Sequence, residues 1–274
     1  MYCTHYGFRE NPFNVTSDPS FLYLSHTHKE ALSHLRYGIE QRKGFIEITG
    51  EIGAGKTTLC RSLLNSLDTS TKTSLVFNPN LPEIQLLEAI MLDFDIIPER
   101  RNKVTFYRQI NNFLLEQLNV GNNVVLIIDE AQNLRNPTLE SIRMLSNLET
   151  EKEKLLQIVL VGQPQLREKL NAPNLVQFRQ RIAVSFHIQA LKAEEVKEYI
   201  NHRIQIAGGS DSVTFSDDAV SLIANHSNGI PRVINIVCDK SLLLGFVKNT
   251  SLIDRSIIQT SIEELRGNIT FAGV

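Results

Sequence analysis

Short apolar runs alternate with longer helical patterns along the first part of the chain. Each run is mostly apolar on both of its alternating faces, and the runs occupy residues 45–50, 73–78, 123–129, 156–162 and 184–188. Strands of this kind are typical of a parallel sheet that helices cover on both sides. The pattern therefore predicts five buried parallel strands.

Helical patterns separate these runs, at residues 57–67, 82–94, 104–118, 137–148 and 164–170. Pro82, Pro137 and Pro164 fall in first turns, where a helix does not need the missing N–H. Strands that alternate with helices indicate βαβ units with right-handed crossovers. We therefore predict an α/β fold with a five-stranded parallel sheet.

The pattern changes near residue 190. The remainder reads as amphipathic helices at residues 193–207, 216–227, 231–246 and 254–265, without a further strong strand. We expect residues 1–190 to form the α/β body, with residues 1–40 leading into it. Residues 191–274 are expected to form a separate helical lid domain.

Composition narrows the class of protein. The chain has 274 residues, 42% hydrophobic and 21% charged, and a formal net charge of −2, which is typical of an ordinary globular protein. Its charge does not favour nucleic acid as a partner. It shows no apolar run long enough for a membrane span and no secretory signal. Its 3 cysteines lack the spacing of a disulfide framework. We expect a cytoplasmic protein.

A phosphate-binding loop is indicated between the first strand and the next helix, where residues 50–57 match G-x-x-x-x-G-K-[S/T]. Glycines let successive backbone N–H groups turn towards phosphate oxygens, and the helix N-terminus adds a positive dipole end. The alternative is a glycine-rich turn that matches by chance. The candidate nucleotide-binding residues are Gly50, Glu51, Ile52, Gly53, Ala54, Gly55, Lys56, Thr57 and Thr58.

Acidic residues end the third apolar run. Lys56 is expected to reach the β- and γ-phosphates, while the Thr57 hydroxyl and the Asp129 carboxylate are the expected ligands of Mg²⁺. Glu130 is the candidate base that orients and deprotonates an attacking water. An ordinary acidic helix cap after a buried strand is the alternative. The Asp-Glu-Ala-Gln string invites comparison with helicases, but the helical tail lacks the second sheet domain that those enzymes need.

Further polar residues follow or precede the later strands. Gln163 ends the fourth strand and is a candidate sensor of the γ-phosphate; a polar strand end is the alternative. Arg179 and Arg181 precede the fifth strand. An arginine inserted into a neighbouring subunit's site would stabilise charge on the transferring phosphoryl group. We favour Arg181 in this role over Arg179, and solvated or salt-bridged arginines are the alternative.

Arg232 breaks a local rule in the helical tail. It lies in the first turn of a helix that Pro231 begins, where a cation opposes the helix dipole. Such a violation is expected where an anion occupies the site. Arg232 is therefore a candidate second sensor that folds over the nucleotide, with an exposed arginine as the alternative.

Together these features resemble the AAA+ ATPases, and further motifs resemble those of the general secretion pathway protein A (ExeA) type. The resemblance covers most of residues 1–268. It is carried by Tyr6-Gly7-Phe8, Asn11-Pro12-Phe13, Asp18-Pro19, Phe21–Ser25, His28–Leu32, Tyr37-Gly38-Ile39, Gly44-Phe45 and Val161–Leu166.

The resemblance implies a cytoplasmic AAA+ module that helps to assemble a cell-envelope secretion or polymer-export machine. Relatives carry a transmembrane helix and a peptidoglycan-binding domain after the ATPase, and this sequence has neither before Val274. We therefore expect a membrane-anchored partner and a peripheral position at the inner membrane, or else a different role. The resemblance also makes Asn11, Pro12 and Phe13 candidates for adenine contact, with packing on the body as the alternative.

The leading hypothesis is a Mg²⁺-dependent ATPase that acts as a homo-oligomeric ring or filament, with its arginine supplied in trans. The alternative is a DNA-binding regulator of transposition, similar to the ATPases TnsC and MuB, for which Arg100, Arg101, Lys103 and Arg108 are the notable basic cluster. A nucleotide-sensing adaptor with negligible hydrolysis is a third hypothesis, and the pair Asp129 and Glu130 argues against it.

Overall fold

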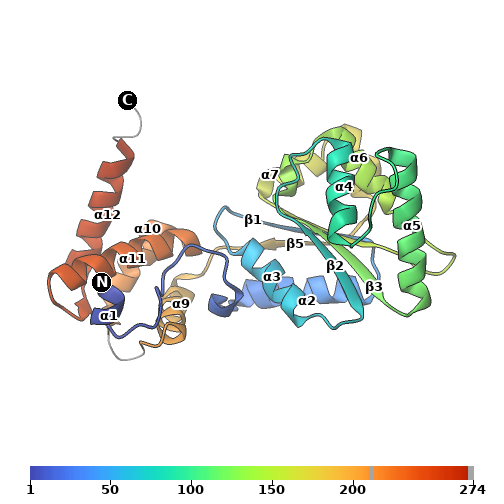
Figure 1. Cartoon of the computed structure of the whole chain (residues 1–274). Helices are drawn as coiled ribbons and strands as arrows, with labels where there is room; N and C mark the ends of the chain where they lie inside the picture. The colour runs from blue at the N-terminus through green and yellow to red at the C-terminus, as the bar shows by residue number, and fades with distance from the viewer. Residues whose placement is uncertain (210–212, 271–274) are drawn as a thin grey trace. The chain divides into compact units, whose positions relative to one another are not determined.

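Contacts divide the chain into two units, which are described separately (Figure 1). The structure is a computed structural model that describes residues 1–209 and 213–270. The sheet unit comprises His26–Glu51 and Leu59–Ile188. The helical unit comprises Met1–Ser25, Ile52–Thr58 and the chain from Gln189 onward.

A five-stranded parallel sheet forms the centre of the sheet unit, in the order β2-β3-β4-β1-β5. The predicted α/β fold is therefore confirmed, and the strand ends are displaced by at most two residues. The strands are β1 (Phe45–Gly50), β2 (Thr71–Val76), β3 (Asn123–Ile128), β4 (Gln157–Gly162) and β5 (Ile182–Ile188).

Helices cover both faces of this sheet (Figure 1). One face carries α2 (His26–Glu40) and α3 (Lys56–Ser66), of which residues 59–66 belong to the sheet unit. The other face carries α4 (Glu83–Asp93), α5 (Lys103–Asn119), α6 (Asn136–Leu145) and α7 (Pro164–Leu170), with the short α8 (Val176–Arg179) before β5. The sequence analysis did not predict α2, although its buried residues recur at helical spacing.

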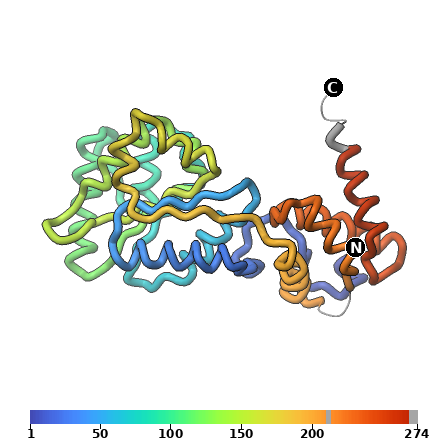
Figure 2. The backbone as a smooth tube through the Cα atoms, turned by 180° about the vertical axis from the view of Figure 1, so that it is seen from behind, coloured from blue at the N-terminus to red at the C-terminus, as the bar shows by residue number. Residues whose placement is uncertain are grey.

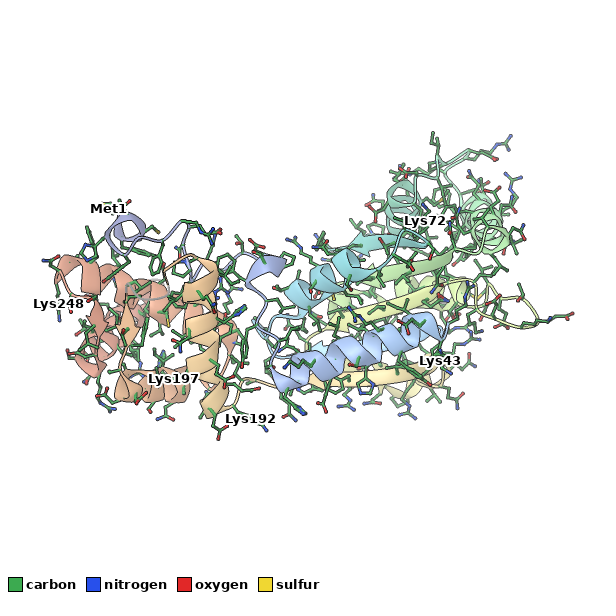
Figure 3. All side chains as sticks on the ribbon, turned by 90° about the horizontal axis from the view of Figure 1, so that it is seen from below. Met1, Lys43, Lys72, Lys192, Lys197 and Lys248 are labelled. Atoms are coloured by element: carbon green, nitrogen blue, oxygen red, sulfur yellow. The ribbon has the colours of Figure 1, made fainter. Side chains whose placement is uncertain are left out.

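The helical unit contains the predicted run of helices after residue 190. They are α9 (Ala193–Ile206), α10 (Asp217–Ser227), α11 (Pro231–Val247) and α12 (Arg255–Thr270). Lys197 projects from α9 and pairs with Asp217 at 2.6 Å (Figure 3). The short strands β6 (Thr214–Phe215) and β7 (Leu252–Ile253) pair in parallel. We did not predict them, because such short strands leave no periodic pattern in the sequence.

The N-terminal segment belongs to the helical unit, whereas we had expected residues 1–40 to lead into the α/β body. Residues 1–25 include α1 (Tyr2–His5) and η1 (Pro19–Phe21) and lie beside the C-terminal helices (Figure 2). Tyr6, Phe8 and Phe13 are buried in the core that these helices form. Burial of these large rings explains the position of the segment.

Arg203 on α9 strengthens this attachment. Its guanidinium donates hydrogen bonds to the carbonyl oxygens of Pro12 at 2.5 Å and Asn14 at 3.0 Å. The same guanidinium lies 4.8 Å from the ring centroid of Phe21. Hydrogen bonds and a cation–π contact therefore tie the N-terminal segment to α9.

Replacing Phe13 with Ala should destabilise the helical unit. Phe13 is 1% exposed, and its ring packs against Phe215 at a centroid distance of 6.2 Å. The cavity left by Phe13→Ala should cost about 3–5 kcal/mol of unfolding free energy, measured by urea denaturation. The matched control is Phe77→Ala, because Phe77 is 47% exposed. Equal losses in the two variants would contradict this packing role.

Candidate nucleotide-binding site

The predicted phosphate loop joins β1 to α3, so the expected strand–loop–helix arrangement is present. β1 ends at Gly50 and α3 begins at Lys56. Gly53 and Gly55 have φ values of 81° and 91°, in the left-handed region that favours glycine. Lys56 is 6% exposed. This geometry suits a loop whose backbone curls around an anion at a helix N-terminus.

Arg232 contacts the phosphate loop within the helical unit. The Arg232 N–H donates to the Gly53 carbonyl oxygen at 3.2 Å. A Cβ added to Gly53 would lie 2.5 Å from the Arg232 Cβ. Arg232 lies in the first turn of α11, after Pro231, and is exposed. The candidate second sensor is therefore adjacent to the loop, as its proposed role requires.

Acidic residues follow the carboxyl end of β3, as predicted. Asp129 is 3% exposed, and its backbone N–H donates to the Val76 carbonyl oxygen of β2 at 2.9 Å. Its Oδ1 accepts the Glu130 N–H at 2.8 Å, which orients the carboxylate. Glu130 has a φ of 51°, and this left-handed conformation turns the chain sharply after the strand.

Gln163, the candidate sensor, meets Glu130 directly. The Gln163 Nε2 donates to Glu130 Oε2 at 3.0 Å. Gln132, which the sequence analysis did not single out, donates from Nε2 to the same oxygen at 2.5 Å. The only sequence signal for Gln132 was its place in the Asp-Glu-Ala-Gln string. The structure thus joins the ends of β3 and β4 through three polar side chains.

The candidate trans arginines are held on the surface of their own sheet unit. The Arg181 guanidinium donates to Asn147 Oδ1 and, at 3.3 Å, to Ser146 Oγ, just after α6. Arg179 is exposed and lies 3.4 Å from Asn171 Oδ1. Neither contact involves Asp129, Glu130 or Gln163. Their action on a neighbouring subunit therefore stays a prediction.

The candidate adenine contacts lie in the N-terminal segment of the helical unit. The Phe13 ring is buried in the core of this unit, and the Pro12 carbonyl accepts from Arg203. Asn11 Nδ2 donates to Asp239 Oδ1 at 3.0 Å. These contacts attach the segment to the helices, and adenine contact stays a prediction for all three residues.

Most residues of the basic cluster that suggested DNA binding form ion pairs with acidic side chains. Arg101 pairs with Glu88 at 3.0 Å, Lys103 pairs with Glu83, and Arg108 pairs with Glu99. Such pairing offsets the positive charge that would attract a phosphate backbone. The geometry of this cluster does not favour the DNA-binding alternative.

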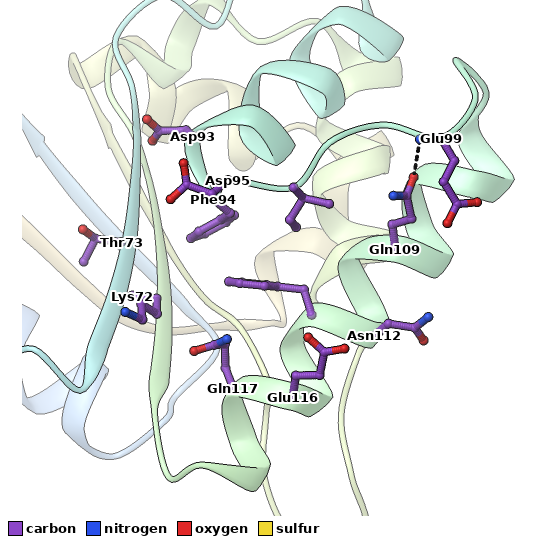
Figure 4. A pocket seen from close by; sticks show the side chains of 12 residues that line it. Lys72, Thr73, Asp93, Phe94, Asp95, Glu99, Gln109, Asn112, Glu116 and Gln117 are labelled. Atoms are coloured by element: carbon purple, nitrogen blue, oxygen red, sulfur yellow. Dashed lines mark hydrogen bonds between the residues drawn. The ribbon is translucent and has the colours of Figure 1, made fainter.

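A cavity of ≈ 610 Å³ in the sheet unit lies beside the first half of β2 and between α4 and α5 (Figure 4). Its lining includes Lys72 on β2 and four carboxylates, which are Asp93, Asp95, Glu99 and Glu116. Carboxylates repel phosphate groups. This cavity is therefore unsuited to a nucleotide triphosphate.

Residues 39–170 match a family described as an AAA domain. General secretion pathway protein A of Aeromonas hydrophila is 39% identical over 268 residues, which cover 97% of this chain and 49% of that protein. The ORC2 protein of Aeropyrum pernix, solved in ADPNP–ADP complexes, superposes with a TM-score of 0.69 at 17% identity, covering 94% of this chain and 72% of that chain. Residues 39–170 of this chain thus form an AAA domain.

The resemblance to general secretion pathway protein A, inferred from the residues, is thereby confirmed. The chain spans about half the length of the Aeromonas protein (49%). RuvB of Thermotoga maritima shares the fold with a TM-score of 0.57 at 21% identity, covering 87% of this chain and 68% of that chain. No helix within residues 1–209 and 213–270 is both long enough and apolar enough to cross a membrane.

Replacing Gly53 with Ala should lower the stability of the protein for two reasons. The φ of 81° penalises any side chain, by about 1–2 kcal/mol. The overlap with the Arg232 Cβ should add about 1–3 kcal/mol. Gly121→Ala is the control, because Gly121 has a φ of 79° but nothing within 4 Å of an added Cβ. Thermal unfolding should show the larger loss for Gly53→Ala; equal losses would argue against the Arg232 contact.

Proposed function

We propose that this AAA+ chain hydrolyses ATP with Mg²⁺ and acts as a switch or motor in the assembly of a cell-envelope secretion or polymer-export system. The observation that carries the hydrolysis proposal is the 3.0 Å hydrogen bond between Gln163 Nε2 and Glu130 Oε2. It supports the proposal because the Glu130 carboxylate and the Gln163 amide meet after β3 and β4, and β4 also pairs with β1, the strand that precedes the phosphate loop.

Each residue has a chemical part in the proposed reaction. The water oxygen bonds to the terminal phosphorus while the bond from that phosphorus to the β–γ bridging oxygen breaks. ADP leaves with that oxygen, and the proton that Glu130 takes from the water passes to the phosphate product. Lys56 and the loop N–H groups neutralise the phosphates, so most of the catalysis is positioning and charge stabilisation.

Thr57 and Asp129 are the residues that would hold Mg²⁺. A hydroxyl and a carboxylate are the hard oxygen ligands that this ion prefers. The Asp129 carboxylate is oriented by the Glu130 N–H at 2.8 Å, which suits a ligand of fixed direction. When bound, the ion would neutralise charge on the β- and γ-phosphates.

The arginines extend the proposal beyond one subunit. Arg232 is exposed beside Gly53, and its guanidinium would bind phosphate oxygens of the loop's nucleotide. Arg181 would serve the site of an adjoining copy, which requires a homo-oligomer. It would exchange its hydrogen bonds with Asn147 and Ser146 for the phosphate oxygens of the neighbouring site.

The cellular role rests on the similarity to general secretion pathway protein A. That similarity covers 97% of this chain, so the proposed setting is the cytoplasmic side of an envelope machine. We propose a membrane-anchored protein as the partner that brings the ATPase to the inner membrane. We do not propose a DNA-binding role, because Arg101, Lys103 and Arg108 are paired with acids.

Glu130→Gln should separate binding from hydrolysis. The amide keeps the shape of the carboxylate but cannot accept a proton, so turnover should fall by about 10²–10⁴-fold with ATP affinity retained. Lys56→Ala is the contrasting variant and should lose ATP binding, because its cation no longer meets the phosphates. Calorimetry with Mg²⁺ and ATP measures binding, and phosphate release measures turnover. Undiminished turnover by Glu130→Gln would contradict the assigned base.

Arg181→Ala should lower turnover by about 10³-fold or more without weakening ATP binding, because the arginine acts in the transition state. Arg179→Ala should have a smaller effect. Mixing Arg181→Ala with Glu130→Gln should restore part of the turnover, since each protomer supplies what its neighbour lacks. No recovery in mixed oligomers verified by light scattering would refute action in trans.

A further inference from the structure

Gln132 uses both ends of its amide within the site. Its Nε2 donates to Glu130 Oε2 at 2.5 Å, and its Oε1 accepts the backbone N–H of Gln163 at 3.1 Å. The Gln163 Nε2 completes a ring of hydrogen bonds by donating to Glu130 Oε2 at 3.0 Å. An amide that donates and accepts in this way fixes the distance between two neighbouring strand ends.

The backbone around Gln132 leaves little room for another arrangement. Gln132 lies in η2 (Ala131–Asn133), directly after the left-handed Glu130. A Cβ added to Gly162 would lie 2.8 Å from Gln132 Oε1 and 2.8 Å from Leu166 Cδ2. The bare backbone of Gly162 therefore makes the space in which the Gln132 amide reaches Gln163.

Lys169 holds the same turn from the other side. Its Nζ donates to the Gln132 carbonyl oxygen at 3.1 Å and to the Leu134 carbonyl oxygen. Lys169 lies near the end of α7, and Gln163 is the N-cap of that helix. Residues of α7 and its N-cap therefore hold both parts of this region. Lys169 binds the backbone of the turn that contains Gln132, and Gln163 binds the side chain of Glu130.

The two oxygens of the Glu130 carboxylate differ in their hydrogen bonds. Both N–H groups point at Oε2, and donation to a charged oxygen stabilises the charge there. Oε1 has no donor among the hydrogen bonds of this ring. In the hydrolysis proposed above, Oε1 would therefore be the oxygen that takes the proton of the attacking water.

We propose that Gln132 is the positioning residue for Glu130 in the hydrolysis proposed above, on which this role rests. Gln132 holds Oε2 so that Oε1 faces the attacking water. When the Gln163 side chain turns to the terminal phosphate, the Gln132 Nε2 remains on Oε2 and keeps the carboxylate in place. Because Gln132 also binds the backbone of Gln163, it keeps Glu130, the base, at a fixed distance from Gln163, the sensor.

The test compares two variants of nearly equal size. Gln132→Met removes the donor and the acceptor, and kcat should fall about 10–100-fold, the loss typical when an orienting hydrogen-bond partner is removed. The KM and the ATP dissociation constant should stay near their wild-type values. Gln132→Glu keeps the size of the side chain but removes its N–H donors and places a like charge beside Glu130, so kcat should again fall while KM and the ATP dissociation constant stay near their wild-type values.

Gln165→Met is the matched control, because Gln165 is an exposed glutamine on α7. It should keep the wild-type kcat and KM. Thermal unfolding checks that each variant is folded, and if Gln132→Met is not, the kcat and KM of the isosteric Gln132→Glu decide. Wild-type kcat in either folded Gln132 variant, or a loss that appears in KM instead of kcat, would overturn the role of Gln132 alone. Absence of hydrolysis by the wild-type chain would overturn the proposed function as well.

Discussion

The parallel pairing of β3, β4 and β1 is the constraint on which the sheet side of the site depends. β4 pairs with both of its neighbours, so all three strands end at the same edge. Glu130 follows β3, Gln163 follows β4 and the phosphate loop follows β1. Glu130 and Gln163 are distant in sequence but become neighbours because each follows within two residues of the end of a buried apolar strand. The apolar runs that drive folding therefore also assemble the chemistry.

The helical unit is held together by contacts between segments that lie far apart in the sequence. Buried rings of the N-terminal segment, such as Phe13, and the hydrogen bonds of Arg203 attach residues 1–25 to helices that lie far away in sequence. The phosphate loop groups with this unit because Arg232 lies against Gly53. The loop is thus continuous with the sheet through the chain and in contact with the helices through Arg232.

Much of the fold could be predicted from the sequence, because burial on both faces gives each strand a local signature. The phosphate loop and the acidic residues after β3 could also be predicted, because their chemistry needs particular residue types at fixed spacings. The grouping of residues 1–25 with the helical unit could not be predicted, because the contacts that attach them to its helices are long-range: nothing near Phe13 in the sequence indicates that its ring packs against Phe215. Gln132 was overlooked for a similar reason, since its bond to Gln163 crosses between strands.

Two contacts between distant segments, Gln132 with Gly162 and Arg232 with Gly53, each require a glycine at one of the two positions. A side chain at position 162 would occupy the space of the Gln132 Oε1, and one at position 53 would occupy that of the Arg232 Cβ. In each case a bare backbone on one segment and a functional side chain on another occupy the same small volume. Since protein interiors are close-packed, neither partner can change size alone without displacing the other. The glycine at 162 is therefore as much a part of the Glu130 site as the glutamine it admits.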